Sequence, residues 1–368
     1  MQNNTAAPEH RALLWIAIIA LVGLILRIQA SAGALWLDEA WSAVFAHDAG
    51  TPLGVFNRIN HDNNHHLNSL WLQWVGLGAP PLVARALSIA TGVVGIVMAG
   101  LIGLRRGPVA GVVTALLFAL SPALVTLGSE ARGYAPMALA ALVAIWLVDR
   151  WLDGDPKADR PVAIAICFYL GALCQLTMIF AACAIVGWPF IVLWRREGLG
   201  TAVRRTARLF GLGLAALGAA ALLVFGPALS GMEFGFGAYQ PFTFLLFWKG
   251  VIGLLGFAVG VPTISFWLPA GAMILLILAR TLGTPRLAFY WVAIVAFPLA
   301  LALIRMMNAG HPRYYLLIGL ALLLLMGEVL AALIRAGGWR RLAGGAALAL
   351  FAASSAWANL DLLETRRG

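Results

Sequence analysis

Charged residues are scarce in this chain, and their scarcity excludes most classes of soluble protein. Of its 368 residues only 11% are charged, whereas 62% are hydrophobic and the mean hydropathy is +0.91. Water-soluble domains carry about a quarter charged residues. No stretch of the chain is both long and polar enough to form a separate soluble domain. The composition therefore indicates an integral membrane protein.

Acidic residues are the rarer of the two charge types, with 15 Asp and Glu against 25 Lys and Arg and a formal net charge of +10. A basic excess can indicate nucleic-acid binding. Here the basic residues lie mostly in short clusters between apolar runs, as the positive-inside rule expects of cytoplasmic loops. The charge therefore predicts topology, and no nucleic-acid partner is expected. The clusters lie at residues 105–106, 150–160, 195–208, 280–286 and 335–341.

Cysteine is also scarce. Cys167, Cys174 and Cys183 all lie inside apolar runs and show neither paired spacing nor a metal-ligand pattern. We interpret them as small buried hydrophobic residues.

Long apolar runs are what the sequence has in abundance. Runs of about 20 residues, each sufficient to cross a bilayer core of roughly 30 Å, recur from end to end. With the basic clusters inside, the N-terminus is inside and about eleven spans are predicted. We expect an all-α polytopic transmembrane protein, a single domain over residues 1–368 with no separate soluble C-terminal domain. The expected spans are 12–28, 82–104, 108–127, 134–151, 161–175, 177–194, 209–228, 263–280, 287–305, 314–335 and 342–358.

The remaining segments are assigned to the outer face or its surface. Residues 243–260 are expected to be re-entrant or interfacial, because a further span there would place the basic cluster at 280–286 outside. The first outer loop, 30–80, is expected to contain two short juxtamembrane helices, at 38–49 and 67–77. The other outer loops are 128–133, 229–243 and 306–313.

Two adjacent acids stand out in the first outer loop. The stretch 35-LWLDEAWSAVFAHD-48 places Asp38 and Glu39 between tryptophans, directly after the first helix. They can be solvated acids that begin a short helix, since Asp favours such positions. They can equally be a catalytic base or metal ligands. The residues alone leave both interpretations open.

Three further motifs carry polar residues to the outer face. The cluster 61-HDNNHH-66 suggests zinc, but its spacing matches no common zinc template, and substrate contacts or solvated residues are the more frequent alternatives. The turn 128-GSEARGYAP-136 holds Glu130 and Arg132. They form either an ion pair that contributes little stability or a functional pair. The motif 311-HPRYY-315 begins a helix, where Arg and Tyr anchor a span or bind a lipid phosphate.

In this order the motifs resemble the glycosyltransferase-C superfamily, and within it the branch of protein O-mannosyltransferases and lipid A aminoarabinose transferases. The matching stretches are 37-LDEAWS-42, 64-NHHLNSLWL-72 with 85-RALS-88, 121-SPALVTLGSEARGYA-135 and 313-RYYLLIG-319. Two features depart from the family. His65-His66-Leu67-Asn68 stands where members often have His-Pro-Pro-Leu, and many relatives carry a soluble domain after the last helix.

The resemblance implies a membrane glycosyltransferase that takes a sugar from a polyprenyl-phosphate carrier. The acceptor would be a lipid, glycan or protein at the outer face of the membrane, which we expect to be the inner membrane of a bacterium, facing the periplasm. Membrane lipids are the other expected partners. No cofactor is expected, and nothing in the sequence indicates a divalent cation.

The chemistry of such a transfer assigns roles to the motifs. A phosphate leaving group is a weak base, with a second pKa of about 6, so it needs positive charge more than a general acid. Arg132 and Arg313 are the candidates, because guanidinium groups bind phosphate through two hydrogen bonds. A carboxylate desolvated among tryptophans has a raised pKa and suits the base, which we assign to Asp38. One base and one displacement would invert the anomeric centre.

The predicted site residues follow from these roles. Asp38 and Glu39 are the catalytic candidates, with Glu39 orienting the acceptor or supporting the loop. The candidate substrate-binding residues are Arg58, His61, Asp62, His65, His66, Glu130, Arg132, Tyr134, His311, Arg313 and Tyr314. No metal ligand is assigned.

Two other classes of function remain open. A lipid or ion transporter or flippase would place acids in the middle of its helices, whereas here only Glu328 is plainly within the membrane, and no internal repeat is visible. A polysaccharide polymerase or ligase that uses a lipid-pyrophosphate donor usually has a larger outer loop late in the chain.

Overall fold

The computed structural model describes residues 6–229, 231–233, 235, 240–261 and 265–367. Over these residues the chain is helical, and the only β-type pairing is a single bridge between His61 and Gly235. The chain divides into two compact units. Unit 1 contains Met1–Arg27, Val93–Thr126 and Gln240–Thr365, and unit 2 contains Ile28–Gly92, Leu127–Tyr239 and Arg366–Gly368.

Seven helices among the described residues are long and apolar enough to cross a membrane. They confirm the predicted class, an all-α polytopic membrane protein. Four further apolar helices are shorter, so the count of eleven spans stays a prediction. The seven are Pro8–Ala30, Pro81–Leu104, Tyr134–Leu152, Met178–Glu197, Leu199–Leu229, Pro312–Arg335 and Gly338–Arg366, and the shorter four are Pro108–Leu120, Phe244–Val259, Trp267–Thr281 and Leu287–Leu303.

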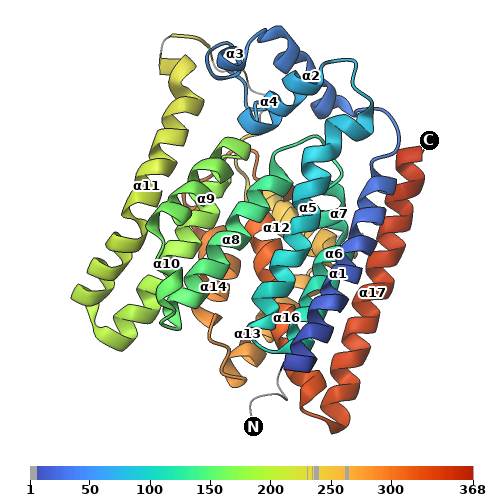
Figure 1. Ribbon diagram of the computed structural model, residues 1–368, viewed down its shortest axis with the longest axis vertical. Coiled ribbons are helices and arrows are strands. Elements are labelled where there is room, and N and C mark those ends of the chain that lie inside the picture. The colour runs from blue at the N-terminus through green and yellow to red at the C-terminus, as the bar shows by residue number, and fades with distance from the viewer. Residues whose placement is uncertain (1–5, 230, 234, 236–239, 262–264, 368) are drawn as a thin grey trace. The chain divides into compact units, whose positions relative to one another are not determined.

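Unit 2 is built on four consecutive helices that pack against their neighbours in sequence (Figure 1). They are α8 (Tyr134–Leu152), α9 (Pro161–Cys174), α10 (Met178–Glu197) and α11 (Leu199–Leu229). The helix α9 contacts the other three, with its phenyl ring of Phe168 stacked 6.2 Å from Phe210. A proline opens α9, where the missing N–H would have no partner inside the helix. The N-terminal part of α5 (Pro81–Leu104), as far as Gly92, belongs to the same unit.

Three short helices in residues 30–80, the predicted first outer loop, complete unit 2. Two were predicted: α2 (Leu37–Asp48) and α4 (His66–Val75), which pack on each other. The third, α3 (Pro52–Asn57), was not predicted. Its start is well defined, because Thr51 Oγ1 accepts a hydrogen bond from the Gly54 backbone N–H at 3.1 Å and Pro52 occupies the first turn. These helices contact the large ones through α4 on α9 and α3 on α11.

Unit 1 surrounds one helix that is apolar on all sides. This helix, α16 (Leu316–Arg335), is buried along nearly its whole length and packs against α6 (Pro108–Leu120), α12 (Phe244–Val259) and α13 (Trp267–Thr281). A helix that is hydrophobic all round belongs in a core. Its one acid, Glu328, is paired with Arg286 and accepts a hydrogen bond from Tyr290 Oη at 2.8 Å. The predicted intramembrane acid is thus neutralised within the unit.

Prolines disturb the regular helix in two predicted spans of unit 1. The run 108–127 breaks at Ser121, between α6 and α7 (Pro122–Leu127), because a residue before proline is disfavoured in the helical region. The run 287–305 is continuous, as α14 (Leu287–Trp291), a π-helical turn η2 (Val292–Ala296) and α15 (Phe297–Leu303). The π turn precedes Pro298, whose ring and missing N–H disturb the regular ladder.

The ambiguous segment 243–260 forms α12, which has 16 residues. At 1.5 Å per residue it is about 24 Å long, shorter than a bilayer core of roughly 30 Å. Its placement as a re-entrant or interfacial segment stays a prediction. The start of the next predicted span, at 263–264, and much of the outer loop 229–243 lie outside the described residues.

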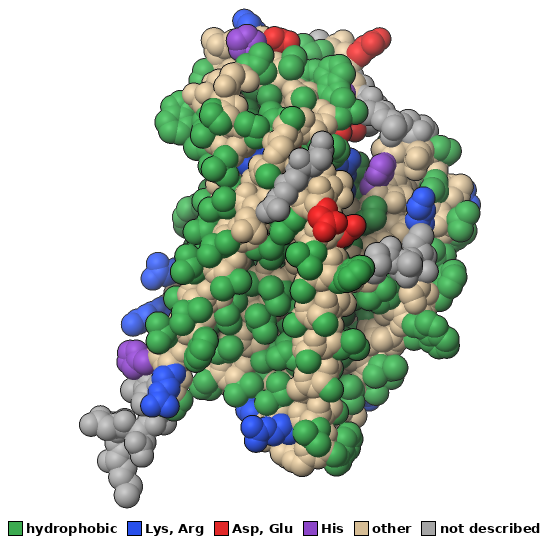
Figure 2. All heavy atoms as spheres, turned by 90° about the vertical axis from the view of Figure 1, so that its right-hand side faces the viewer, with side chains coloured by type: hydrophobic (Ala, Val, Ile, Leu, Met, Phe, Trp, Pro, Cys, Tyr) green, Lys and Arg blue, Asp and Glu red, His purple; other side chains and the backbone are tan. Residues whose placement is uncertain are grey.

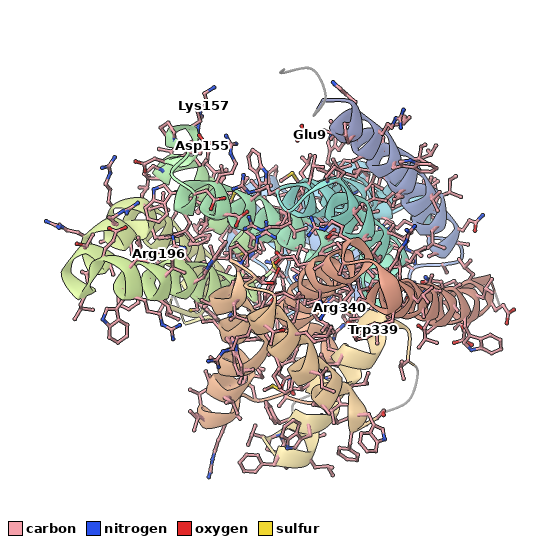
Figure 3. All side chains as sticks on the ribbon, turned by 90° about the horizontal axis from the view of Figure 1, so that it is seen from below. Glu9, Asp155, Lys157, Arg196, Trp339 and Arg340 are labelled. Atoms are coloured by element: carbon pink, nitrogen blue, oxygen red, sulfur yellow. The ribbon has the colours of Figure 1, made fainter. Side chains whose placement is uncertain are left out.

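The last helix of unit 1, α17 (Gly338–Arg367), exposes an apolar face (Figure 2). Leu342, Leu350 and Trp357 are each more than 70% exposed. Such a face is costly in water and favourable against lipid tails. Its first turn carries Trp339 and Arg340 of the basic cluster at 335–341, which are both exposed (labelled in Figure 3).

The predicted topology can be tested by labelling single cysteines with a membrane-impermeant thiol reagent. We expect a cysteine at Asp62 to react from outside and one at Lys157 to react only after permeabilisation, because Lys157 lies in the basic loop after α8 (Figure 3). Both residues are exposed, so neither result depends on unfolding. The native Cys183, which is exposed and not buried as predicted, is first replaced by serine. Labelling of Lys157 alone from outside would show that the topology is inverted.

Candidate active site

Asp38 and Glu39 occupy the first turn of α2, where negative charge is favoured by the helix dipole. Neighbouring helical residues point about 100° apart, so the two carboxylates face different surroundings. The Glu39 side chain is fully buried, whereas that of Asp38 is 26% exposed. The prediction that Asp38 is the desolvated carboxylate is therefore wrong, because Glu39 is the buried one. Asp38 is the acid that solvent or substrate can reach.

Glu39 is held by four hydrogen bonds. Its Oε1 accepts from Arg85 Nε at 2.9 Å and from the Ala131 backbone N–H at 2.5 Å. Its Oε2 accepts from Arg85 Nη2 at 2.6 Å and from the Trp36 backbone N–H at 3.1 Å. The last bond is the back-bond of a capping box, in which a Glu three positions into the helix binds the N-cap N–H. Both oxygens are thus fully occupied by the protein.

Arg85, on α5, is saturated in the same way. Its five N–H groups make five hydrogen bonds, two to Glu39 and three to the carbonyls of Ser31, Gly33 and Ala34 at 2.8–3.1 Å. Arg85 is fully buried. Through this pair, the turn after α1 (Ala6–Ala30), the start of α2, helix α5 and the loop 128–133 are joined at one point. The interaction positions the site and leaves no donor for a ligand.

Asp38 faces a different arginine. Its Oδ2 lies 2.7 Å from Nη1 of Arg132, which is buried with only 4% of its side chain exposed. The guanidinium carbon lies 5.9 Å from the Trp36 ring and 5.8 Å from the Tyr134 ring, within range of cation–π attraction. Among the described residues, Nε and Nη1 of Arg132 have no hydrogen bond, because the contact with Asp38 has the distance of an ion pair but not hydrogen-bond geometry.

The loop that carries Arg132 is anchored by its backbone. Asn68 Nδ2 donates to the Ala131 carbonyl at 2.8 Å, and Ser88 Oγ donates to the Arg132 carbonyl at 2.9 Å. A Cβ atom at Gly133 would lie 1.7 Å from the Cys174 carbonyl oxygen, so only glycine fits there. The backbone at Arg132 is therefore fixed by contacts that do not involve its own side chain.

Glu130 lies in the same loop and pairs with Arg366 at 2.7 Å. Burial raises the pKa of Glu130, and the nearby charge of Glu39 adds to the increase, while Arg366 and Arg132 oppose it. The predicted pairing of Glu130 with Arg132 is replaced by pairing with Arg366.

The histidine cluster contributes four residues in different surroundings. His65 is buried with its ring 5.7 Å from Tyr134, and His66 stacks 5.0 Å from Phe56. Burial lowers the pKa of His66 to about 4. His61 accepts a hydrogen bond at Nδ1 from the Asn63 N–H and lies beside the exposed Asp62. No group of three or more His, Cys, Asp or Glu in the described part of the chain is arranged to hold a metal ion.

Two predicted groups belong to other parts of the structure: Arg58 to the opposite end of α2, and the motif 311–315 to unit 1. Arg58 donates from Nη1 to the Ala49 carbonyl at 3.4 Å, at the C-terminal end of α2. His311, Arg313 and Tyr314 belong to unit 1, in and beside the 3₁₀ turn η3 (Pro312–Tyr315), which packs on α12. That Arg132 and Arg313 both bind the donor phosphate stays a prediction.

Arg85 was not among the predicted site residues. Its signal was present in the motif 85-RALS-88, but nothing in the local sequence indicated that it would pair with Glu39, 46 positions earlier. Asn63 was also omitted. It is buried and donates from Nδ2 to the Asp38 carbonyl at 2.8 Å, so the histidine loop is tied to the start of α2.

Comparison with known proteins shows a similarity of fold. No protein-family model matches the chain, and no curated protein matches at a significant level. Among solved structures, the chain is similar to the crystal structure of the Archaeoglobus fulgidus oligosaccharyltransferase in the apo form, with a TM-score of 0.55 and 14% identity. The match covers 97% of this chain and 56% of that one, so this chain spans about half its length. At this identity the likeness establishes a shared fold, in agreement with the glycosyltransferase-C fold expected from the motifs.

The Glu39–Arg85 pair gives a stability prediction. We expect Glu39→Gln to lower the free energy of unfolding by about 3–5 kcal/mol, because removing one partner leaves a buried charge without compensation. Unfolding of the purified protein by denaturant in detergent measures the change. The matched control is Glu364→Gln, at an exposed position of α17, which should unfold like the parent. Equal midpoints for the two variants would show that the pair does not stabilise the fold.

His66 gives a pH prediction. Because its pKa is lowered from 6.5 to about 4 in the folded state, the stability that it contributes is present above pH 6.5 and is lost as the pH falls toward 4. The shift corresponds to about 3 kcal/mol. Melting temperatures measured between these pH values should fall less for His66→Gln than for the parent. The exposed His10→Gln serves as control and should keep the full dependence.

Proposed function

We propose that the protein is a membrane glycosyltransferase that moves a sugar from a polyprenyl-phosphate-linked donor to an acceptor, with inversion, at the outer face of the membrane. The observation that carries the proposal is the partly exposed Asp38 beside the buried guanidinium of Arg132. An acid that can take a proton and a cation that can bind a phosphate are the two groups that such a transfer needs. The shared fold with an oligosaccharyltransferase supports the class of reaction.

Arg132 is suited to the donor phosphate. Its Nε and Nη1 lack hydrogen bonds in the described structure, and buried polar groups without partners are costly. A phosphate oxygen would satisfy them in a site of low dielectric, where charge interactions are strong. The rings of Trp36 and Tyr134 hold the guanidinium in place. As the bond to the sugar breaks, its electron pair leaves with the phosphate, and Arg132 stabilises the added charge.

Asp38 is suited to the base. Without donor it neutralises Arg132, and a bound phosphate would compete for the same guanidinium and free the carboxylate. Asp38 then accepts the proton of the acceptor hydroxyl while the acceptor oxygen forms its bond to the anomeric carbon. Attack from the face opposite the phosphate inverts that carbon. Asp38 is thus available as the general base only when the lipid-linked sugar donor is bound.

Glu39 supports this arrangement without touching the substrates. Its oxygens hold the N-terminus of α2 and the Ala131 N–H, so they fix the distance between Asp38 and the loop of Arg132. His65 and Tyr134, whose rings lie 5.7 Å apart, line the same region and are proposed substrate contacts. The proposed location is a bacterial inner membrane with this site facing the periplasm.

Replacement of Asp38 tests the function. We expect Asp38→Asn to reduce sugar transfer from a synthetic polyprenyl-phosphate sugar by at least about 100-fold, the low end for removal of a general base. Donor binding, measured separately, should be retained or tighter, because the competing carboxylate is gone. Arg132→Lys should instead weaken donor binding, since lysine lacks the two-pronged donor geometry.

The control is Asp153→Asn, an exposed aspartate after α8, which should transfer sugar at the parent rate. Near-normal turnover by Asp38→Asn would end the assignment of the base. A protein that binds no polyprenyl-phosphate lipid would contradict the proposed function as a whole.

A further inference from the structure

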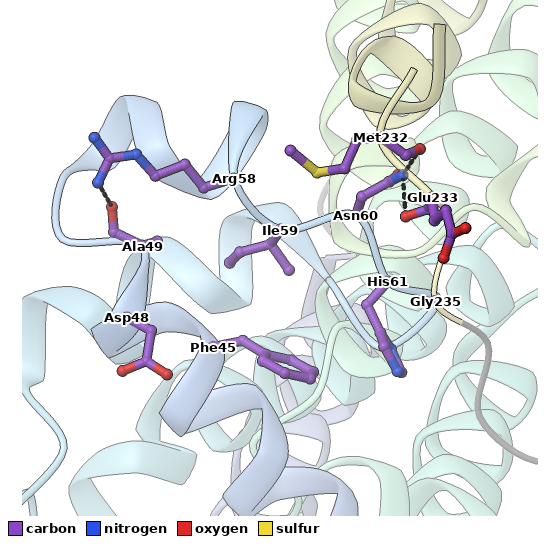
Figure 4. Close-up of a pocket in the computed structure, with 10 residues that line it drawn as sticks. All are labelled: Phe45, Asp48, Ala49, Arg58, Ile59, Asn60, His61, Met232, Glu233 and Gly235. Carbon is purple, nitrogen blue, oxygen red and sulfur yellow. Dashed lines mark hydrogen bonds between the residues drawn. The ribbon is translucent and has the colours of Figure 1, made fainter. Parts of the chain in front are cut away.

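We propose that a cavity at the C-terminal end of α2 binds an uncharged carbohydrate portion of the acceptor. The inference rests on the proposed function and names the class of molecule that receives the sugar. The cavity has a volume of about 420 Å³ and lies wholly within unit 2 (Figure 4). That size falls within the range of small-molecule sites, about 300–1,000 Å³. It is lined by Phe45, Asp48, Ala49, Arg58, Ile59, Asn60, His61, Met232, Glu233 and Gly235.

One wall of the cavity is aromatic. The Phe45 ring lies 5.3 Å from the Trp41 ring and 5.0 Å from the His61 ring. Trp41 and Phe45 thus form an aromatic row along α2, with His61 beside it; Phe45 and His61 are half-buried and Trp41 is exposed. Met232 and Ile59 add apolar surface. Sugar rings present C–H groups on their faces and hydroxyls at their edges. An aromatic wall with a few polar groups around it matches that pattern, as it does in other small-molecule sites.

The polar groups favour a neutral ligand rich in hydroxyls. Asp48 and Glu233 are exposed carboxylates, which accept hydrogen bonds. Arg58 points away from them in Figure 4 and donates to the Ala49 carbonyl. His61 Nδ1 is engaged within the protein, 3.0 Å from the Asn63 N–H and 2.9 Å from Asp62 Oδ1, which leaves Nε2 as the ring nitrogen for a ligand. The cavity thus has two carboxylates and one arginine that is already hydrogen-bonded elsewhere. This charge makes it unfavourable for an anionic ligand such as a phosphate or a uronate.

The walls are joined by specific hydrogen bonds. Asn60 Nδ2 donates to the carbonyls of Met232 and Glu233 at 2.7 Å each. The backbones pair as well, with Gly235 N–H donating to the Asn60 carbonyl at 2.7 Å and Asp62 N–H donating to the Gly235 carbonyl at 3.0 Å. A Cβ atom at position 235 would lie 2.7 Å from His61 Cδ2, so glycine allows this approach. The two loops therefore form one defined wall.

The cavity is connected to the proposed base through α2. Asp38 and Asp48 are ten residues apart on this helix, a distance of about 15 Å at 1.5 Å per residue. Asn63 links the two regions directly, because its side chain donates to the Asp38 carbonyl at 2.8 Å and its N–H donates to His61 at 3.0 Å. A ligand in the cavity would thus be the part of an extended acceptor that lies beyond the reacting hydroxyl.

The proposal is tested by sugar binding to the purified full-length protein in nanodiscs, followed by saturation-transfer NMR. The probes are the neutral trisaccharides maltotriose, mannotriose and chitotriose and the anionic trigalacturonate. We expect at least one neutral trisaccharide to bind and trigalacturonate to bind more weakly than any of them. Phe45→Ala and Glu233→Gln should each lower the affinity for the neutral trisaccharide at least tenfold. Glu233 is exposed, so its replacement tests the site even if Phe45→Ala fails to fold.

The matched controls are Trp74→Ala, an exposed aromatic of α4, and Glu364→Gln, an exposed acid of α17, and both should bind like the parent. No binding of any neutral trisaccharide up to millimolar concentration, equal affinity in the cavity variants and the controls, or preference for trigalacturonate would each overturn the proposal. The readout needs no transfer activity. Donor-lipid binding and the activity of Asp38→Asn therefore test the proposed function separately.

Discussion

The buried pair of Glu39 and Arg85 is the interaction on which the rest of unit 2 depends. A charge inside a protein is tolerated only when it is paired and hydrogen-bonded. Here every N–H of the guanidinium and both carboxylate oxygens have partners, and those partners belong to four separate pieces of chain. The pair therefore fixes where α2 begins and where the loop of Arg132 lies. Asp38 owes its position to this constraint.

The two adjacent acids differ because a helix rotates between neighbouring residues. Glu39 turns inward to an arginine that has no donor left, whereas Asp38 turns to an arginine with donors that the protein does not fill. One ion pair holds the site together, and the other can be exchanged for a ligand. The same division recurs in unit 1, where Arg286 and Glu328 form a buried pair beside Tyr290 and neutralise the only acid of α16.

Helix α2 links the proposed chemistry to the proposed recognition of the acceptor. Its first turn carries the base and its last turn borders the carbohydrate cavity, about three helical turns away. The residues between them present an aromatic row on one side and small buried residues on the other. A rigid element between two subsites keeps the reacting hydroxyl and the distal sugar at a constant separation, which flexible loops alone would not do.

The sequence by itself determined the membrane class, the long apolar helices and two of the short helices in residues 30–80, because apolar length and periodicity are local properties. It also singled out Asp38, Glu39 and Arg132. Only the tertiary structure decided which acid is buried, that Arg85 holds it, and that Glu130 pairs with Arg366 rather than Arg132. It alone brought residues 60–61 against 232–233 and 235 to form the cavity. Such partners lie tens to hundreds of positions apart, and a contact set by packing leaves no period or spacing in the sequence from which it could be predicted.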